Sequence, residues 1–216
     1  MQKVRGSTPL APILLNTIMN KKLLIHLYKS RNLSMAEIAK ELNITHAKVC
    51  YWFKKFDIKR RGPSEGSYIK QNPNGDPFKI KKKLTLKEKQ LLLMGLMAYW
   101  AEGNKKNRHL VGLGNLDGRM IKLFLEFLRK ICRIDETRVK LYVRVYKKFN
   151  RKKAFVYWEK LLGLSKNQIH VYLHNDMRSN PNKQWSKNGI AAIQVGNIKL
   201  KQWLDNAIEE YLSRVI

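Results

Sequence analysis

The chain has 216 residues, and its 44 Lys and Arg against 16 Asp and Glu give a formal net charge of +28. Hydrophobic residues make up 44% of the sequence, which is enough for a folded core and excludes a wholly disordered chain. The excess of positive charge indicates a polyanionic partner, because phosphates would neutralise the self-repulsion of the chain.

The sequence carries no clear signal for a membrane span or for export. No window approaches about 18 uninterrupted apolar residues. The N-terminal run has a basic start and a short apolar stretch, but Asn16 and Lys21 interrupt it and no small-residue cleavage site follows. Cys50 and Cys132 have neither disulfide nor metal-site spacing. We therefore expect a cytoplasmic protein with reduced thiols, in which residues 1–19 form a loose N-terminal extension.

Residues 20–61 show three short helical patterns, and the first covers about 20–30. Ser34 and Glu37 have the spacing of a capping box that begins the second helix. Thr45 is a suitable N-cap for the third helix. The pattern SMAEIAKELNITHAKVCYWFKKFDIKRR resembles the helix-turn-helix of resolvase-like and transposase-like DNA readers. An interaction module of three helices is the alternative.

The third helix and the residues after it supply the expected DNA contacts. Apolar side chains recur there at i, i+3, i+4 and i+7 and are expected to face the core: Val49, Trp52, Phe53 and Phe56. In a helix-turn-helix this helix enters the major groove, while flanking basic residues hold phosphates. The expected base-reading residues are His46, Lys48 and Tyr51. The expected phosphate contacts are Lys54, Lys55, Lys59, Arg60 and Arg61.

The rest of the chain predicts a linker and an α+β section. Residues 62–83 hold Gly, Pro, Asn and Asp at close intervals without apolar periodicity, which predicts a basic linker. In residues 84–216, helical patterns cover 86–102, the stretch from the turn at 115–118 to Ile131, 151–162 and 198–214. Strand patterns cover 109–114, 138–148, 168–174 and 189–196.

Glu102 ends the most apolar helix of the chain. A carboxylate in the last turn lies at the negative end of the helix dipole, which costs about 0.3–1 kcal/mol. A nearby cation would offset this cost, either Lys105 and Lys106 or a bound divalent metal. An exposed pair with lysine is the plain alternative. Small residues spaced by three let another helix approach closely: Gly95, Ala98 and Ala101.

The run LMGLMAYWAEG resembles the motif helix of LAGLIDADG homing endonucleases and ends in the same small-acid-Gly pattern at 101–103. The resemblance implies a domain over residues 84–216 in which an antiparallel sheet forms a saddle on DNA and helices cover its other face. It implies that Glu102 is the catalytic residue and binds Mg²⁺ or another divalent cation. A single motif implies a homodimer, whose interface would contain Gly95, Ala98 and Ala101. The same resemblance implies that the saddle reads bases through Lys140, Tyr142, Arg144 and Tyr146.

Three functional interpretations remain open at this point. The leading one is a sequence-specific, double-stranded DNA-binding protein that acts as a homodimeric homing-type endonuclease with a divalent metal. The alternative is a transcriptional regulator that keeps the fold and only binds DNA, which Met97 and the bulky Tyr99 and Trp100 favour because the family has smaller residues there. The third is an RNA-binding role like that of a maturase.

Overall fold

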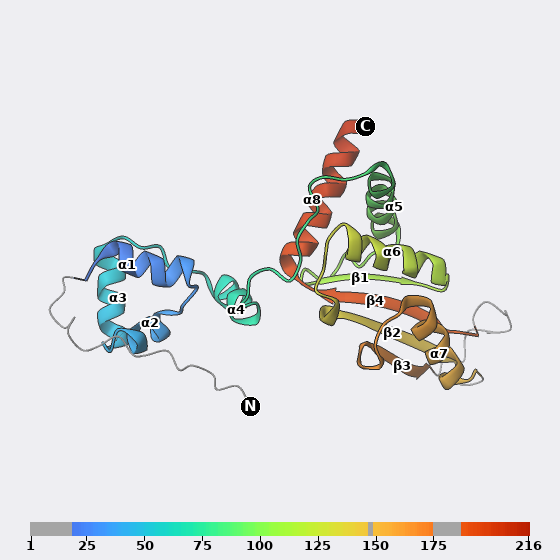
Figure 1. Ribbon diagram of the computed structural model, residues 1–216, viewed down its shortest axis with the longest axis horizontal. Helices are drawn as coiled ribbons and strands as arrows, with labels where there is room; N and C mark the ends of the chain where they lie inside the picture. The colour runs from blue at the N-terminus through green and yellow to red at the C-terminus, as the bar shows by residue number, and fades with distance from the viewer. Residues whose placement is uncertain (1–18, 147–148, 175–186) are drawn as a thin grey trace, which may run out of the picture. The chain divides into compact units, whose positions relative to one another are not determined.

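The computed structural model describes residues 19–146, 149–174 and 187–216 (Figure 1). The chain divides into two compact units, one ending at Gly75 and the other covering Asp76–Ile216. Each unit has its own apolar core. Of the expected N-terminal extension, residues 1–18 lie outside the described residues. None of the helices in the described ranges has the length and apolar character needed to cross a bilayer.

The first unit contains the three helical segments that the sequence predicts. They are α1 (Lys21–Ile25), which continues as a short π-helix (His26–Ser30), α2 (Met35–Glu41) and α3 (His46–Lys55). The capping box of α2 is confirmed, because the Ser34 hydroxyl accepts from the Glu37 N–H and the Glu37 carboxylate accepts from the Ser34 N–H. The Thr45 hydroxyl accepts from the Lys48 N–H and caps α3.

Part of the expected linker is helical. Helix α4 (Pro63–Gln71) begins with Pro63 in its first turn, where the missing N–H and the fixed φ favour a helix start. Glu65 adds a favourable charge at the same end. No residue of α4 is buried, so no apolar period in the sequence indicated this helix.

The last part of the expected linker belongs to the second unit. The Lys79 N–H donates to the Cys132 carbonyl at 2.9 Å, and the Lys81 N–H donates to the Ile131 carbonyl at 2.9 Å. Phe78, Ile80 and Leu84 pack against the core of this unit. The second unit therefore starts earlier than residue 84, the boundary expected from the sequence.

The second unit has the α+β fold class that the sequence predicts. Its main elements are α5 (Leu86–Glu102), β1 (Leu110–Asn115), α6 (Gly118–Lys130), β2 (Val139–Tyr146), α7 (Arg151–Leu162), β3 (Ile169–His174), β4 (Ile190–Gly196) and α8 (Ile198–Val215). Short 3₁₀ turns precede β2 (Glu136–Arg138) and β3 (Lys166–Gln168). All eight main elements match the expected ranges to within two residues at each end.

The four strands form one mixed sheet in the order β1-β4-β2-β3. Strand β4 is antiparallel to both β1 and β2, whereas β2 and β3 are parallel. The expectation of an antiparallel sheet is therefore wrong for this last pair. The reason is α7, which follows β2 and carries the chain back to the start of β3, as a helical crossover between parallel strands does.

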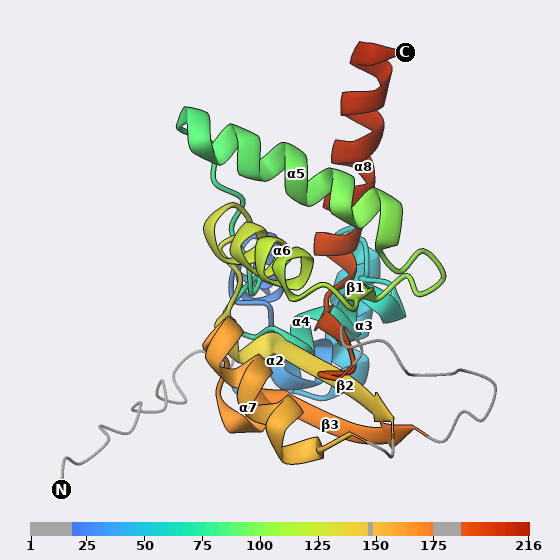
Figure 2. The same cartoon turned by 90° about the vertical axis from the view of Figure 1, so that its right-hand side faces the viewer.

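The core of the second unit lies between the sheet and its helices. Helix α6 lies between α5 and the sheet (Figure 2), and α7 packs against β2 and β3. The inward side chains of β2 are fully buried, as the alternation in the sequence predicts: Val139, Leu141, Val143 and Val145. The alternate side chains of β2 lie on the opposite face of the sheet and remain partly or fully exposed.

Candidate nucleic-acid interface

Helix α3 has one buried and one exposed face. Val49 and Phe53 are buried in the first core, and Trp52 and Phe56 are partly buried beside them, as predicted. Three of the expected DNA-contacting residues fall at i, i+3 and i+7 on the exposed side: Lys48, Tyr51 and Lys55. Lys54, Lys59 and Arg60 are also exposed. The exposed side of α3 therefore presents one aromatic ring among several cations.

Lys55 lies close to two aromatic rings of its own helix. Its Nζ is 4.9 Å from the centroid of the Trp52 ring and 5.9 Å from that of the Tyr51 ring. Trp52 in turn stacks on Phe56 with a centroid distance of 5.3 Å. These contacts hold the Lys55 ammonium near the surface of α3 by cation–π attraction.

His46 does not share a face with the other base-reading candidates. It lies in the first turn of α3, and its Nδ1 is 3.6 Å from the Cys50 Sγ one turn further on. Two residues along a helix are about 200° apart around its axis. The expectation that His46 and Lys48 present one reading surface is therefore not met by the geometry.

Arg61 has a structural role instead of the expected phosphate contact. Its guanidinium donates to the backbone carbonyls of Tyr28, Asn32 and Leu33 and lies 4.1 Å from the centroid of the Tyr28 ring. The Arg61 N–H donates to the Tyr28 hydroxyl at 2.7 Å. These bonds tie the chain after α3 to the end of the π-helix, so this guanidinium is already occupied.

The strand residues expected to read bases share one face of the sheet. Lys140, Tyr142 and Tyr146 are partly exposed, and Arg144 is exposed. The parallel register places three further residues of β3 opposite them, which were not among the expected contacts: His170, Tyr172 and His174. The alternation in QIHVYLH is the signal for these residues, but only the register shows which ring lies beside which.

Glu102 is exposed at the end of α5. The next residue, Gly103, forms an isolated antiparallel bridge with Leu113 of β1. Glu102 therefore lies at the β1 edge of the sheet. Lys105 does not pair with it, because its Nζ donates to the Tyr99 carbonyl at 2.5 Å and lies over the Tyr99 ring. Within the described residues, Glu102 has no ion-pair partner.

The Tyr99 ring lies between two lysines. Burial raises the pKa of the Tyr99 phenol. Burial, and then the neighbouring Lys201 ammonium, hold the pKa of Lys105 below its ordinary value. Lys201 is itself buried and pairs with Asp205 at 2.6 Å. This cluster anchors the end of α5 through packing and carbonyl capping.

The described residues of one chain do not gather a ready-made set of metal ligands. No cluster of three or more His, Cys, Asp or Glu side chains occurs in the ranges that the structure describes. Mg²⁺ is usually held by one or two carboxylates together with waters and substrate phosphates. Glu102 supplies one such carboxylate, and the resemblance implies that a second comes from another copy of the chain.

The small residues of α5 do not form the expected dimer strip. Gly95 is buried against α6, where an added Cβ would lie 2.3 Å from the Phe127 Cγ. Ala98 is half-buried against the same core, and only Ala101 is exposed. The close helix approach that these residues predict therefore occurs inside the chain, between α5 and α6.

The outer side of α5 is apolar and exposed instead. Its large side chains are 46–54% exposed: Leu93, Met94, Met97 and Trp100. They follow the helical spacing i, i+1, i+4 and i+7 and form one stripe. We call these four residues the α5 stripe.

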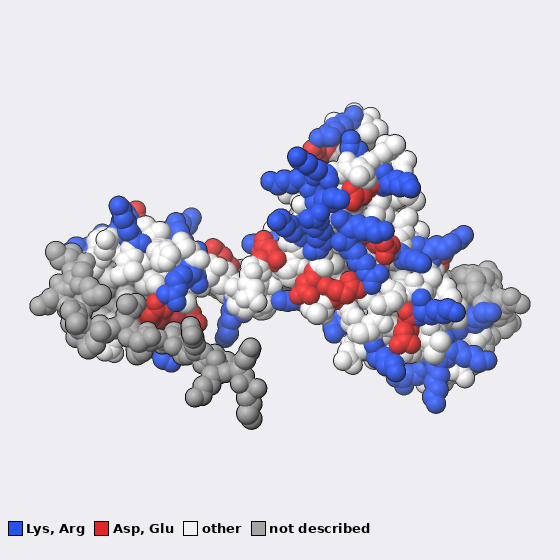
Figure 3. All heavy atoms as spheres, in the orientation of Figure 1, with Lys and Arg blue, Asp and Glu red and all other residues white. Residues whose placement is uncertain are grey.

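Basic residues also cover the segment that leads to α5, and Figure 3 shows Lys and Arg gathered there. Lys79, Lys82, Lys83 and Arg133 are exposed around this segment. Lys81 pairs with Glu88. The second unit therefore has a cationic surface in addition to the sheet face.

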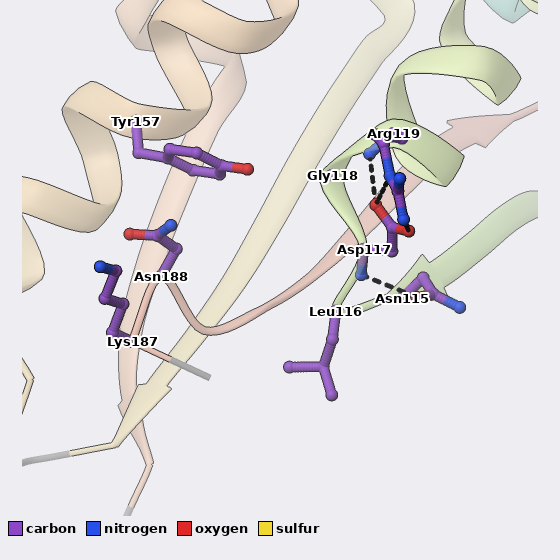
Figure 4. Close-up of a pocket in the computed structure, with 8 residues that line it drawn as sticks. All are labelled: Asn115, Leu116, Asp117, Gly118, Arg119, Tyr157, Lys187 and Asn188. Atoms are coloured by element: carbon purple, nitrogen blue, oxygen red, sulfur yellow. Dashed lines mark hydrogen bonds and ion pairs between the residues drawn. The ribbon is translucent and has the colours of Figure 1, made fainter. Parts of the chain in front are cut away.

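A recess lies between the start of α6, α7 and the residues before β4 (Figure 4). Asp117 caps α6 by accepting from the Arg119 N–H at 2.8 Å, and it also pairs with the Arg119 guanidinium. Tyr157 and Lys187 line the other side. Because Asp117 already neutralises Arg119, Lys187 is the only lining residue that still offers an unpaired positive charge among the residues that the structure describes. The lining does not match a metal or nucleotide site.

Comparisons with protein-family models, with curated proteins and with solved structures give no match to this sequence.

Proposed function

We propose that this protein binds double-stranded DNA through helix α3. The observation that carries the proposal is the exposed side of α3, opposite its buried face. The residues on this side are Lys48, Tyr51, Lys54 and Lys55. Lys59 and Arg60 follow as exposed cations. A helix with this surface suits the major groove, with lysines on the flanking phosphates and Tyr51 and Lys48 near base edges. Such a role belongs in the cytoplasm, with the cellular DNA.

Fluorescence anisotropy with a labelled duplex tests this proposal. Neutralising Lys54 and Lys55 to Gln should weaken binding and lower the slope of log affinity against log salt by about 1 for each phosphate that is no longer bound. Lys21→Gln combined with Lys22→Gln is the matched control, because both lysines are exposed in α1 of the same unit and two charges are again removed. Equal reductions of affinity in the double variant and in the control would contradict a role for α3.

The α5 stripe supports a second copy of the chain as a further partner. Four large apolar side chains at about half exposure on one helix are unusual for a surface without a partner. Glu102 ends the same helix, and a second copy of the chain would bring a second Glu102 carboxylate, the larger of the two numbers usual for Mg²⁺. Pairing of two α5 helices through the stripe would cover these apolar side chains, whereas Glu102 lies about 200° around the helix from Trp100 and outside the stripe.

Sedimentation equilibrium tests the homodimer. Leu93→Glu combined with Met97→Glu should give a monomer, because two charges would be buried in the interface. Val156→Glu should leave the dimer intact, since Val156 is also an exposed apolar residue but lies on α7. A wild-type protein that stays monomeric at high concentration would rule out this partner.

Phosphodiester hydrolysis is the second candidate function and depends on that dimer. The observation that favours it is Glu102, an exposed acid without an ion-pair partner among the described residues at the edge of the sheet. A divalent ion would supply water activation and stabilisation of the leaving oxygen. Glu102 from each chain would hold it. The resemblance of residues 93–103 to the LAGLIDADG helix supports the same assignment.

Nicking of a plasmid that carries the DNA around the protein's own reading frame separates enzyme from regulator. Cleavage with Mg²⁺ that is abolished by EDTA and in Glu102→Gln supports the endonuclease. Glu209→Gln is the control, because Glu209 is also exposed but lies on α8. Binding without cleavage supports the regulator.

A further inference from the structure

The exposed face of β2 and β3 carries more aromatic surface than the fold requires. The core side of β2 is already complete, because its four inward side chains are fully buried. On the other face, Tyr142, His170 and Tyr172 lie next to one another, and Tyr172 is 51% exposed. A cluster of exposed aromatic rings indicates a binding surface, because apolar patches that stay in contact with water often mark a site that a partner covers. We call these three residues the ring cluster.

The rings of this cluster share one orientation. The Tyr142 and His170 rings have a centroid distance of 5.1 Å and an interplanar angle of 22°. The Tyr142 and Tyr172 rings are 6.2 Å apart with an angle of 13°. Nearly parallel rings at these distances stack on one another, so a further planar group extends the row where a ring face is not covered by a neighbouring ring.

Small residues continue the row of Tyr142 across the sheet. The register places Ala192 beside Tyr142 and Gly114 beside Ala192. An added Cβ at Gly114 would meet the Ala192 Cβ at 3.6 Å, an ordinary contact, so packing does not demand glycine there. The pair leaves a low area next to the Tyr142 ring, with room for a planar group.

Cations flank the ring cluster on the same strand face. Lys140 and Arg144 lie two residues before and after Tyr142, and Arg144 is exposed. Gln194 is the cross-strand neighbour of Lys140 and adds an amide. Rings between cations match a ligand in which flat, uncharged groups alternate with phosphates.

From this arrangement we infer that the ring cluster binds single-stranded nucleic acid by stacking unpaired bases on Tyr142, His170 and Tyr172. In a duplex the base faces are covered by neighbouring pairs, and recognition goes through donors and acceptors at base edges. The ring faces that no neighbouring ring covers suit bases that are not paired, because such bases also have a free face. This surface is separate in its residues from α3, and the inference stands whether or not α3 binds a duplex.

The test measures binding of labelled oligothymidylate and oligouridylate, which have bases but little structure of their own, to the full chain. Tyr142→Leu and Tyr172→Leu should each weaken binding about 5- to 150-fold, the range expected when one base stack is removed. Tyr142→Phe keeps the ring and should bind like the wild type. Tyr157→Leu is the matched control, because Tyr157 is a partly exposed tyrosine on α7. Circular dichroism checks that each variant folds.

Two further arms separate stacking from charge. An oligonucleotide with abasic sites keeps its phosphates and should bind much more weakly than the intact one. A 2-aminopurine base in the oligonucleotide should lose fluorescence on binding to the wild type and less so with Tyr142→Leu. Lys54→Gln with Lys55→Gln should change duplex binding without this effect.

Several results would overturn the inference. They are equal affinity for abasic and intact strands, unchanged affinity in both leucine variants, or displacement of the strand by a blunt duplex with equal sensitivity to Tyr142→Leu. The last result would make this face a duplex-reading saddle. If the strand binds and the leucine variants do not bind it, the ratio of DNA to RNA affinity shows which of the two chemistries the ring cluster prefers.

Discussion

Two adjacent arginines, Arg60 and Arg61, have different roles in this protein. Both were expected to contact phosphates, yet Arg61 bonds three backbone carbonyls whereas Arg60 is exposed. Hydrogen bonds from a charged donor are worth about 1.5–3 kcal/mol. The position of a guanidinium, and not its type, therefore decides whether it serves the fold or the ligand.

Replacement of these two arginines separates the two roles. Arg61→Met should lower the free energy of unfolding of the first unit by about 1–3 kcal/mol, because the carbonyls lose a charged donor. Arg60→Met should change it by less than about 0.5 kcal/mol but weaken duplex binding. Urea denaturation and anisotropy measure the two effects. The same destabilisation in both variants would contradict this division.

Gly95 is the second residue whose role depends on its surroundings. Gly95→Ala would bring a Cβ against the Phe127 ring and should destabilise the second unit by about 1–3 kcal/mol through overpacking. Gly66→Ala is the comparison, because Gly66 lies in α4 with open space where a Cβ would be added. This variant should be slightly more stable than the wild type, since alanine favours a helix more than glycine does. Thermal unfolding followed by circular dichroism measures both changes.

Helix α2 shows how a short element depends on its first residue. The Ser34 hydroxyl, and then the Ser34 N–H, hold the pKa of Glu37 below its ordinary value of 4.5. A carboxyl whose pKa is lowered by folding adds stability above its unfolded pKa and loses it as the pH falls through the folded value. The capping box should therefore matter at neutral pH and lose part of its effect in acid.

Ser34→Ala tests this directly. The variant should be less stable than the wild type by about 1 kcal/mol at neutral pH, the usual cost of removing an N-cap. The difference should shrink once Glu37 is protonated, and the pKa of Glu37 should rise toward its ordinary value. Denaturation at two pH values and an NMR titration of Glu37 provide the measurements. A difference that is constant with pH would show that the carboxylate takes no part in the cap.

Elements were predictable where one face is apolar and local rules decide. The alternation in β2 and the helical period of α6 and α7 indicated their ranges, because each of these elements buries one face in the core. Helix α4 has no buried residue, so its sequence has no period to detect. The strand–helix–strand order of β2, α7 and β3 is the pattern that favours parallel pairing, but the register that places Tyr142 beside His170 depends on residues far apart in the chain.

At the scale of the whole molecule, the two separate cores predict that a core mutation in one unit destabilises that unit alone. Val49 is fully buried in the first core and Val143 in the second. Val49→Ala and Val143→Ala should each cost about 1–3 kcal/mol, in the first and in the second unit respectively. Hydrogen exchange resolved by residue should show faster exchange only in the unit that carries the change. Reduced protection in both units from either variant would indicate a single cooperative structure.

The pairing of β1 with β4 has a consequence for synthesis of the chain. The strand that joins β1 to β2 is β4, which is made last of the four. On the ribosome, the segment up to Gly75 is complete on the order of ten seconds before β4 emerges, at about 5–20 residues per second. During that interval the nascent chain presents a finished helical unit, while β1 and β2 still lack their middle strand. Premature termination between α7 and β4 would thus release a folded helical head attached to an open, aggregation-prone half-sheet.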